Sequence, residues 1–383
     1  MITHEQYLLL CEREVRQSID ANISRDPFAI ALDKRIAHAA EVATQVKYLD
    51  RARKKLPSYY EARCIIPSLA FEQSSSEECA AHKPLEGGSV LDLTCGLGVD
   101  AFYLSRKFAR VVTIERNEVL ADVARENFRR LGVTNIEVVC GDSAEFVASC
   151  DEHFDWCYAD PDRRGSKGEK LVRLEDCSPD MVALMPRLRS IASRVCIKAS
   201  PMFDVDEASR LFGRVSVEVV SLGDECKEVL IYIGDDVECK SVATALGVGS
   251  YAVMAGSDED IVTPQFRMSE YRWLVQPDVA LQKCRLARRH LAGKADIWSE
   301  NGYGFAVERP TNLIGRLYEI ERIEPFDPKA LKREMKGRRA QLLKRDFPLA
   351  TERLVAMTGI KEGGSEKMAF TSIGGEYLVI RLK

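Results

Sequence analysis

Three acidic side chains follow short apolar segments at positions that suit a nucleotide-like ligand. Asp100 comes two residues after a Gly-Leu-Gly turn, where a carboxylate would repel phosphate but suit a cationic or zwitterionic ligand. Glu115 lies about 20 residues beyond the turn, the spacing of an acid that binds ribose hydroxyls. Asp142 follows the next apolar segment and could accept from an adenine amino group. Each acid alone could be a helix N-cap, but the three together predict a ligand pocket.

The glycine turn follows directly from an apolar segment. Residues 90–93 lead through Thr94 and Cys95 to Gly96 and Gly98, after which a helical pattern begins. Glycine lets the backbone turn tightly and lets a ligand approach it, and a helix N-terminus offers free N–H groups. The dinucleotide-binding fingerprint has a third glycine that this turn lacks, so we expect a different cofactor.

A second group of chemically capable residues ends the apolar segment 154–159. Asp160 could accept a hydrogen bond from an amine, and Arg163 could stack on a base through its guanidinium plane. Asp160-Pro161 could equally be a turn initiator without further function. A turn alone does not require the adjacent pair Arg163-Arg164, so we favour a substrate site.

The elements that must position these residues alternate between short β-rich segments and amphipathic helices. Such alternation predicts a parallel sheet covered on both faces, with the last two strands as an antiparallel edge pair. The expected strands are Ser89–Leu93, Arg110–Ile114, Ile136–Val139, Phe154–Ala159, Arg194–Lys198, Val215–Ser221 and Val229–Ile233. The expected early helices are Asp100–Lys107, Glu118–Leu131 and Ser143–Ser149.

The flanking regions give weaker patterns. The first 85 or so residues are predicted to be helical, with a capping box at Thr3 and Gln6. Residues 239–264 are rich in Gly and Ser and suggest a linker or edge loops. A helix is expected over Asp278–Leu291, followed by short extended pieces.

Composition limits the class of protein. The chain has 383 residues, 46% hydrophobic and 30% charged, which is typical of a globular protein and excludes a disordered or fibrous one. No apolar run approaches about 18 residues, so no membrane span is expected. The 12 cysteines form no CxxC pair and the five histidines show no metal-ligand spacing. Cys140, Cys157 and Cys196 lie in apolar segments, where a thiol packs as a small hydrophobe. The lack of a signal sequence suggests that the protein is located in the cytoplasm.

Charge is unevenly distributed. The whole chain has a net charge of -4, yet residues 326–383 hold 13 Lys and Arg against 7 Asp and Glu. On a helix, the basic residues between 329 and 345 would form a broad positive face. Such a face could be a solvated surface or a phosphate-binding patch, and the sequence leaves both open.

At this point the chain resembles a class I S-adenosylmethionine-dependent methyltransferase, over roughly residues 71–234. The resemblance implies a Rossmann-like, seven-stranded α/β sheet and S-adenosylmethionine as cofactor. Gly96 and Gly98 would line its methionine part, Glu115 would hold its ribose and Asp142 its adenine edge. The residues expected at the cofactor are Asp92, Thr94, Cys95, Gly96, Gly98, Asp100, Glu115, Arg116, Asp142 and Ser143.

The Asp160 segment is similar to two known methyltransferase motifs. In the Asp/Asn-Pro-Pro-aromatic motif of amino methyltransferases, Asp162 and Arg163 would replace the second proline and the aromatic residue. RNA uracil-C5 methyltransferases have Asp-Pro-Pro-Arg, but they need a cysteine at the end of the fifth strand. Ala199 stands at that position, which argues against their mechanism. The remaining candidates are Asp160, Pro161 and Arg163 for catalysis, and Arg164, Lys198, Ser200, Lys332, Arg333, Lys336 and Arg339 for substrate binding.

Other segments resemble bacterial methyltransferases that carry a C-terminal THUMP-like domain. They are Phe71–Glu77, Asp160–Arg164, Lys198–Met202, Glu225–Glu228, Lys344–Pro348, Gly359–Gly364 and the β-rich Tyr377–Leu382. The resemblance implies a helical region over residues 1–70, a methyltransferase domain over 71–240, a small α+β ferredoxin-like domain over 265–323 and a basic, α+β THUMP-like domain over 324–383.

The resemblance and the basic C-terminus together suggest that the chain methylates a nucleotide in structured RNA, such as tRNA or rRNA. RNA would be the partner, held by the C-terminal domain and by the basic cluster Arg51–Lys55. Two alternatives stay open. The acceptor could be a small molecule or a protein, or the chain could be a catalytically silent RNA-binding or scaffold protein with a cofactor fold.

Overall fold

The chain divides into two units. The computed structural model describes residues 2–162, 173–257 and 261–383, so Arg163 and Arg164 lie outside the described residues. Unit 1 comprises residues 1–217 and 228–238, and unit 2 comprises 218–227 and 239–383. Among the described helices, none has the length and apolar character that crossing a membrane requires.

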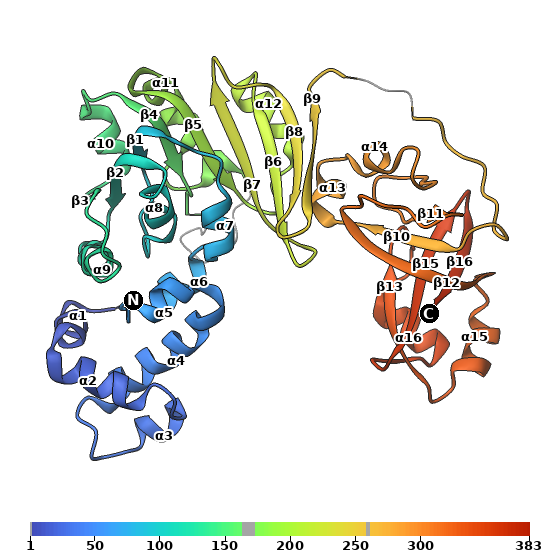
Figure 1. The fold of residues 1–383 in the computed structure, drawn as a ribbon, viewed down its shortest axis with the longest axis horizontal. Helices are drawn as coiled ribbons and strands as arrows, with labels where there is room; N and C mark the ends of the chain where they lie inside the picture. The colour runs from blue at the N-terminus through green and yellow to red at the C-terminus, as the bar shows by residue number, and fades with distance from the viewer. Residues whose placement is uncertain (1, 163–172, 258–260) are drawn as a thin grey trace. The chain divides into compact units, whose positions relative to one another are not determined.

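Seven helices precede the first strand, as the sequence predicts. The Thr3–Gln6 capping box forms, with both reciprocal hydrogen bonds present. Helix α4 buries Val42, Val46 and Leu49 at helical spacing, and Figure 1 shows these helices, in blue, as a cluster of unit 1. Their bounds are α1 (His4–Cys11), α2 (Arg13–Asn22), α3 (Pro27–Ala31), α4 (Ala39–Lys55), α5 (Pro57–Glu61), α6 (Ser68–Gln73) and α7 (Glu77–His82).

All seven predicted strands form, within a few residues of their expected bounds. They are β1 (Gly87–Asp92), β2 (Phe108–Glu115), β3 (Ile136–Cys140), β4 (Phe154–Ala159), β5 (Ala192–Ala199), β6 (Ser216–Leu222) and β7 (Glu225–Gly234). The intervening helices are α8 (Val99–Leu104), α9 (Glu118–Arg130), α10 (Ser143–Ser149), η1 (Leu174–Asp176), α11 (Met181–Ile191) and α12 (Val205–Phe212).

The strand order is β3-β2-β1-β4-β5-β7-β6-β8-β9. Strands β1 to β5 are parallel, with Leu91 opposite both Val112 and Cys157, whereas β7 runs antiparallel to β5. The order contains the expected seven-stranded Rossmann-like arrangement. Because the carboxyl ends of parallel strands meet at one edge, the loops after β1, β2, β4 and β5 share that edge.

The expectation of a linker or edge loops over residues 239–264 is wrong for residues 240–254, whereas the described residues from 255 to 264 form no helix or strand. Strands β8 (Lys240–Ala245) and β9 (Gly249–Met254) form an antiparallel hairpin there and extend the sheet. The small residues Ser241, Ala243 and Ala245 obscured the pattern, because β8 carries no alternation of large apolar and polar side chains.

Unit 2 holds a second sheet with the order β11-β10-β12-β16-β15-β13-β14. The long strand β12 pairs with β10 and with β16, and its pairing with β16 shifts register between Ile320 and Arg322. The expected helix over 278–291 is split in two, because Arg285 adopts a left-handed φ of 57°. Bounds are β10 (Trp273–Pro277), α13 (Val279–Lys283), α14 (Ala287–Leu291), β11 (Gly304–Ala306), β12 (Gly315–Pro325), α15 (Pro328–Met335), β13 (Arg339–Lys344), α16 (Thr351–Thr358), β14 (Lys361–Glu362), β15 (Glu366–Ile373) and β16 (Glu376–Leu382).

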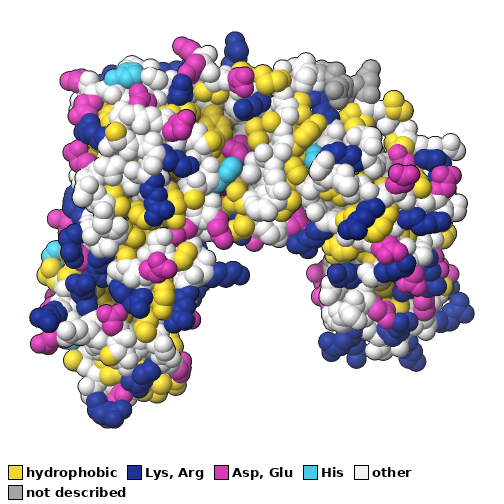
Figure 2. Space-filling model, viewed as in Figure 1, with side chains coloured by type: hydrophobic (Ala, Val, Ile, Leu, Met, Phe, Trp, Pro, Cys, Tyr) yellow, Lys and Arg dark blue, Asp and Glu magenta, His cyan; other side chains and the backbone are white. Residues whose placement is uncertain are grey.

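The expected single basic helix between residues 329 and 345 does not form. Helix α15 ends at Met335, because Lys336 leaves helical geometry and a glycine follows, and the next basic residues lie on β13. Lys332, Arg333, Lys336 and Arg339 are all exposed, but they do not share one helix face. Figure 2 shows Lys and Arg side chains, dark blue, over the part of unit 2 that carries α15, interspersed with acidic ones.

The twelve cysteines are all free thiols. Cys157 and Cys196 are buried in the sheet as expected, but Cys140 is exposed, which corrects its assignment to the core. Strand β3 lies at the edge of its sheet, so its side chains are less covered than those of a central strand.

Candidate active site

Asp92 holds the turn between β1 and α8. Its side chain is 1% exposed, and one oxygen accepts from the backbone N–H and the hydroxyl of Thr94, at 3.0 and 3.3 Å. The other oxygen accepts from the Thr113 hydroxyl at 2.6 Å. Burial raises the pKa of Asp92 to about 7, against the hydrogen bonds from Thr113 and Thr94. Both oxygens accept from donors of the protein, so Asp92 shapes the turn, and a contact from it to the cofactor stays a prediction.

The two glycines of the turn have different roles. Both have left-handed backbones, with φ 55° at Gly96 and 84° at Gly98. A Cβ on Gly98 would lie 2.6 Å from the Phe128 ring, so this glycine is required by packing. A Cβ on Gly96 would meet no atom within 4 Å. The backbone at Gly96 therefore borders open space into which a ligand could fit.

Glu115, at the end of β2, places its carboxylate beside this turn. One oxygen accepts from the Gly96 N–H at 2.9 Å and the other from the Asn117 N–H at 2.8 Å. Burial raises the pKa of Glu115, while these two backbone hydrogen bonds lower it. A carboxylate oxygen with one donor can still accept another, so Glu115 is able to receive two hydroxyl groups.

Asp142 and Ser143 begin α10. One Asp142 oxygen accepts from the backbone N–H groups of Ala144 and Glu145, at 2.8 and 3.2 Å, so Asp142 is an N-cap. The Ser143 hydroxyl donates to the Leu93 carbonyl at 2.6 Å, a hydrogen bond that connects α10 to the end of β1. A contact from Asp142 to adenine stays a prediction that would use its second oxygen.

Two further predicted cofactor residues differ in exposure. Cys95 is buried, and burial raises the pKa of its thiol well above the ordinary value, so it is an uncharged packing residue. Arg116 is exposed and donates to the Ser178 hydroxyl at 3.4 Å, with Asp162 at 3.7 Å. A contact from either residue to the cofactor stays a prediction.

Asp160 follows β4 and is tied to the glycine turn. Its backbone N–H donates to the Thr94 hydroxyl at 2.7 Å, and its carboxylate accepts from the ammonium of Lys198 at the end of β5. Asp162, two residues further on, forms an antiparallel bridge with Ser178. Asp160 is thus fixed through both its backbone and its side chain.

Lys198 is the centre of a buried network of charges. The residue is 5% exposed, and its ammonium also donates to the Ser75 hydroxyl at 2.8 Å. Asp100 and Glu228 lie 3.8 and 3.9 Å from the same ammonium. Burial acts to lower the pKa of Lys198, but Asp160, Asp100 and Glu228 outweigh it and raise the pKa above its ordinary value.

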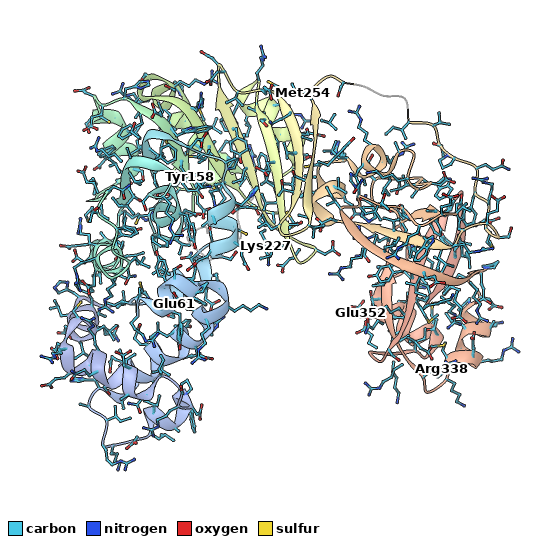
Figure 3. All side chains as sticks on the ribbon, viewed as in Figure 1. Glu61, Tyr158, Lys227, Met254, Arg338 and Glu352 are labelled. Atoms are coloured by element: carbon cyan, nitrogen blue, oxygen red, sulfur yellow. The ribbon has the colours of Figure 1, made fainter. Side chains whose placement is uncertain are left out.

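A second lysine completes the network. Lys83 is 1% exposed and lies 2.7 Å from Asp100 and 3.5 Å from Glu228. The Tyr158 hydroxyl, on β4 in the sheet of unit 1 (labelled in Figure 3), donates to Asp100 at 3.1 Å. Burial opposes ionisation of Asp100, yet Lys83 and Lys198 hold the pKa of that carboxyl below its ordinary value. Burial raises the pKa of Glu228, whose Oε1 has no hydrogen-bond partner.

The network unites segments that the sequence presents separately. Ser75, Asp160, Lys198 and Glu228 come from four of the segments that carry the family resemblance. Sequence reasoning singled out Asp100, Asp160 and Lys198 but missed Lys83 as a partner of both carboxylates. Three carboxylates and two ammonium groups leave one formal negative charge, which suits a positively charged ligand nearby.

The other predicted substrate residues that the structure describes are not members of this network. The Ser200 hydroxyl accepts from the Met202 N–H at 3.1 Å and so supports the turn after β5. The basic residues of α15 and β13 belong to unit 2. Their roles on a substrate stay predictions.

Comparisons with known proteins agree with this geometry. Residues 90–161 match the family model described as a methyltransferase domain, and residues 315–382 match the one described as THUMP domain-like. The chain is similar to a crystal structure of a candidate methyltransferase from Porphyromonas gingivalis W83, with a TM-score of 0.83 and 26% identity over 100% of this chain and 98% of that one.

Two curated relatives match in part. An uncharacterised S-adenosylmethionine-dependent methyltransferase of Mycobacterium tuberculosis (strain ATCC 25618 / H37Rv) is 26% identical over 234 residues, 58% of this chain and 59% of the relative. Ribosomal RNA small subunit methyltransferase J of Coxiella burnetii (strain RSA 493 / Nine Mile phase I) is 32% identical over 127 residues, 29% of this chain and 49% of the relative. The chain therefore spans well under two thirds of either relative.

Proposed function

Since the chain belongs to the class I S-adenosylmethionine-dependent methyltransferases with a C-terminal THUMP-like domain, we propose that it methylates a nucleotide in structured RNA, such as tRNA or rRNA. The observation that carries the proposal is Asp160, held between Thr94 and Lys198 next to the turn at Gly96. A carboxylate fixed in this way can orient an acceptor group beside the cofactor.

The residues at the strand ends fit S-adenosylmethionine. Gly96 leaves open space at the backbone, and Glu115 offers two carboxylate oxygens for the ribose hydroxyls. When bound, the cofactor supplies a methyl group on a positively charged sulfur. The excess negative charge of the network around Asp100 favours a cation nearby.

Asp160 would accept a hydrogen bond from the acceptor and hold it in line with the methyl group. Methyl transfer from a sulfonium is a displacement that depends mainly on positioning, so a strong general base is not required. Lys198 would hold the Asp160 carboxylate in place. Arg163 and Arg164 would hold a base or a phosphate of the substrate, as the sequence predicts.

Three observations support RNA as the acceptor. Residues 315–382 match a THUMP-like family model, and a matching relative is named as a ribosomal RNA methyltransferase. Lys332, Arg333, Lys336 and Arg339 are exposed on the same domain and are free to approach phosphates.

The test is to find where the methyl group goes. The full-length protein is incubated with tritiated S-adenosylmethionine and an extract of cells that lack it, and the RNA, protein and small-molecule fractions are counted separately. We expect the label in RNA. Label in protein or in small molecules would favour the alternative acceptors, and no label above background, despite cofactor binding, would favour a silent scaffold.

A further inference from the structure

A cavity of about 420 Å³ lies in unit 2 at the Lys344–Pro348 segment, which the proposed function does not use. It is formed by residues between 276 and 303 and by residues 342–346, on either side of the boundary expected near residue 323. Its polar lining is Gln276, Gln282, Asn301, Tyr303, Lys344, Arg345 and Asp346. A cavity of this size is large enough for a small ligand.

The guanidinium of Arg345 has no side-chain hydrogen bond and no ion pair within the described part of the chain, although its backbone N–H donates to Phe370. Burial lowers the pKa of Arg345, against the effect of nearby acidic groups. A partly buried cation without a counter-ion in contact is unfavourable, and such a group is stabilised when an anion binds.

The acidic neighbours of Arg345 already have donors of their own. These neighbours are Asp224, Asp278 and Asp346. Asp224 and Asp278 each accept two hydrogen bonds, and Asp346 accepts from the Ser299 hydroxyl. They help to keep Arg345 protonated without contacting its guanidinium.

A second unsatisfied donor lines the same cavity. The amide nitrogen of Gln282 is buried and has no hydrogen-bond partner. The lining includes two cations, Lys344 and Arg345, and one acid, Asp346, so its formal charge is positive. Two unused donors and a positive lining call for a ligand that offers acceptor oxygens and negative charge.

We propose that this cavity binds a phosphate group of RNA, with Arg345 as its bidentate contact and Gln282 as a second donor. The proposal rests on the proposed function, because that function makes RNA the partner. The planar fork of an arginine matches two phosphate oxygens, which a lysine cannot do.

The test uses the full-length protein without S-adenosylmethionine, so a failure to methylate RNA does not affect it. Melting temperature is measured during titration with inorganic phosphate at constant ionic strength. Arg345→Gln is compared with Arg353→Gln, which removes the same charge from an exposed position on α16. We expect the melting temperatures of the wild type and of Arg353→Gln to rise with phosphate concentration until they saturate. For Arg345→Gln we expect phosphate to bind about tenfold more weakly. An equal response in Arg345→Gln would overturn the proposal.

A second arm identifies the source of the phosphate. Binding of a fluorescent single-stranded oligoribonucleotide is followed by anisotropy, with inorganic phosphate as competitor. If phosphate displaces the oligoribonucleotide from the wild type but not from Arg345→Gln, the result supports RNA as the ligand. If phosphate binds the protein but does not displace the oligoribonucleotide, the cavity is a site for free phosphate and the RNA assignment is overturned. If Arg345→Gln fails to fold, the variant Gln282→Glu tests phosphate binding in its place. It places a carboxylate in the cavity and should abolish the phosphate response, and an unchanged response would refute the site.

Discussion

The Lys198 ammonium contacts the Asp160 carboxylate where β5 and β4 end side by side. The Lys198 ammonium also lies within 4 Å of the carboxylates of Asp100 and Glu228. One buried cation therefore connects these two carboxylates with Asp160, the residue proposed to orient the acceptor. The position of Asp160 therefore depends on a network that includes residues far apart in the sequence.

Removing Lys198 should strongly destabilise unit 1. In Lys198→Ala, Asp100 and Glu228 keep Lys83 as a partner, whereas Asp160 loses the ammonium that it contacts. Breaking a buried ion pair costs about 3–5 kcal/mol. The free energy of unfolding, measured by urea denaturation, should fall by that amount. Lys54→Ala, at an exposed position on α4, is the control and should change it by less than about 0.5 kcal/mol. A loss below about 1 kcal/mol for Lys198→Ala would mean that the network contributes little.

Gly96→Ala and Gly98→Ala should separate cofactor binding from folding. The Gly98 substitution meets the Phe128 ring and should lower the melting temperature markedly. The Gly96 substitution meets no atom and should cost only about 1–2 kcal/mol for its left-handed backbone, yet it should weaken cofactor binding. Calorimetry with S-adenosylhomocysteine, alongside thermal denaturation, measures both effects. Normal cofactor binding by Gly96→Ala would place the ligand elsewhere.

Glu115→Gln should weaken cofactor binding and also lower the melting temperature modestly, because its NH2 would face one of the two backbone N–H groups that now donate to Glu115. A neutral amide loses one acceptor for the ribose hydroxyls, and hydrogen bonds to a charged group are worth about 1.5–3 kcal/mol. The dissociation constant for S-adenosylmethionine should therefore rise about tenfold or more. Glu118→Gln, at an exposed position in the first turn of α9, is the matched control and should bind normally. Equal affinities in the two variants would remove Glu115 from the site.

His290 should make the stability of unit 2 sensitive to acid. Its Nε2 accepts from the Ile314 N–H at 3.1 Å, and burial, with Lys294, lowers its pKa to about 4. Between that value and its ordinary 6.5, the unfolded chain binds more protons than the folded one, so stability falls as pH drops through this range. Within this range His290 can lower the free energy of unfolding by up to about 1.4 kcal/mol for each unit that the pH falls.

The variant His290→Gln should show a smaller loss of unfolding free energy between pH 7 and pH 5 than the wild type, as followed by urea denaturation. His153→Gln, at an exposed position before β4, should match the wild type. Parallel pH profiles for His290→Gln and the wild type would contradict the assignment of a depressed pKa.

The sequence predicted the central strands β1, β4 and β5 well because their apolar segments are largely buried on both faces and are bounded by turn residues. It failed for β8 and β9, where small residues obscured the pattern, and for α15, where a glycine ends a segment with strong helix formers. In the site, Asp160 and Glu115 could be placed because each follows a strand directly. The partnership of Lys83 with Asp100 and Glu228 could not be predicted, because it joins segments that only the tertiary fold brings together.

The most direct test of the account is the rate of tritiated methyl transfer to RNA from cells that lack this protein, compared between Asp160→Asn and Asp151→Asn. Asp151 is exposed before β4 and supplies the matched loss of a carboxylate. We predict that Asp160→Asn lowers kcat by about 10²-fold or more with an unchanged KM for S-adenosylmethionine, because acceptor orientation is lost while the cofactor residues are intact. Asp151→Asn should keep the wild-type rate. Equal rates for the two variants, or a lack of transfer to RNA by the wild type, would contradict the account.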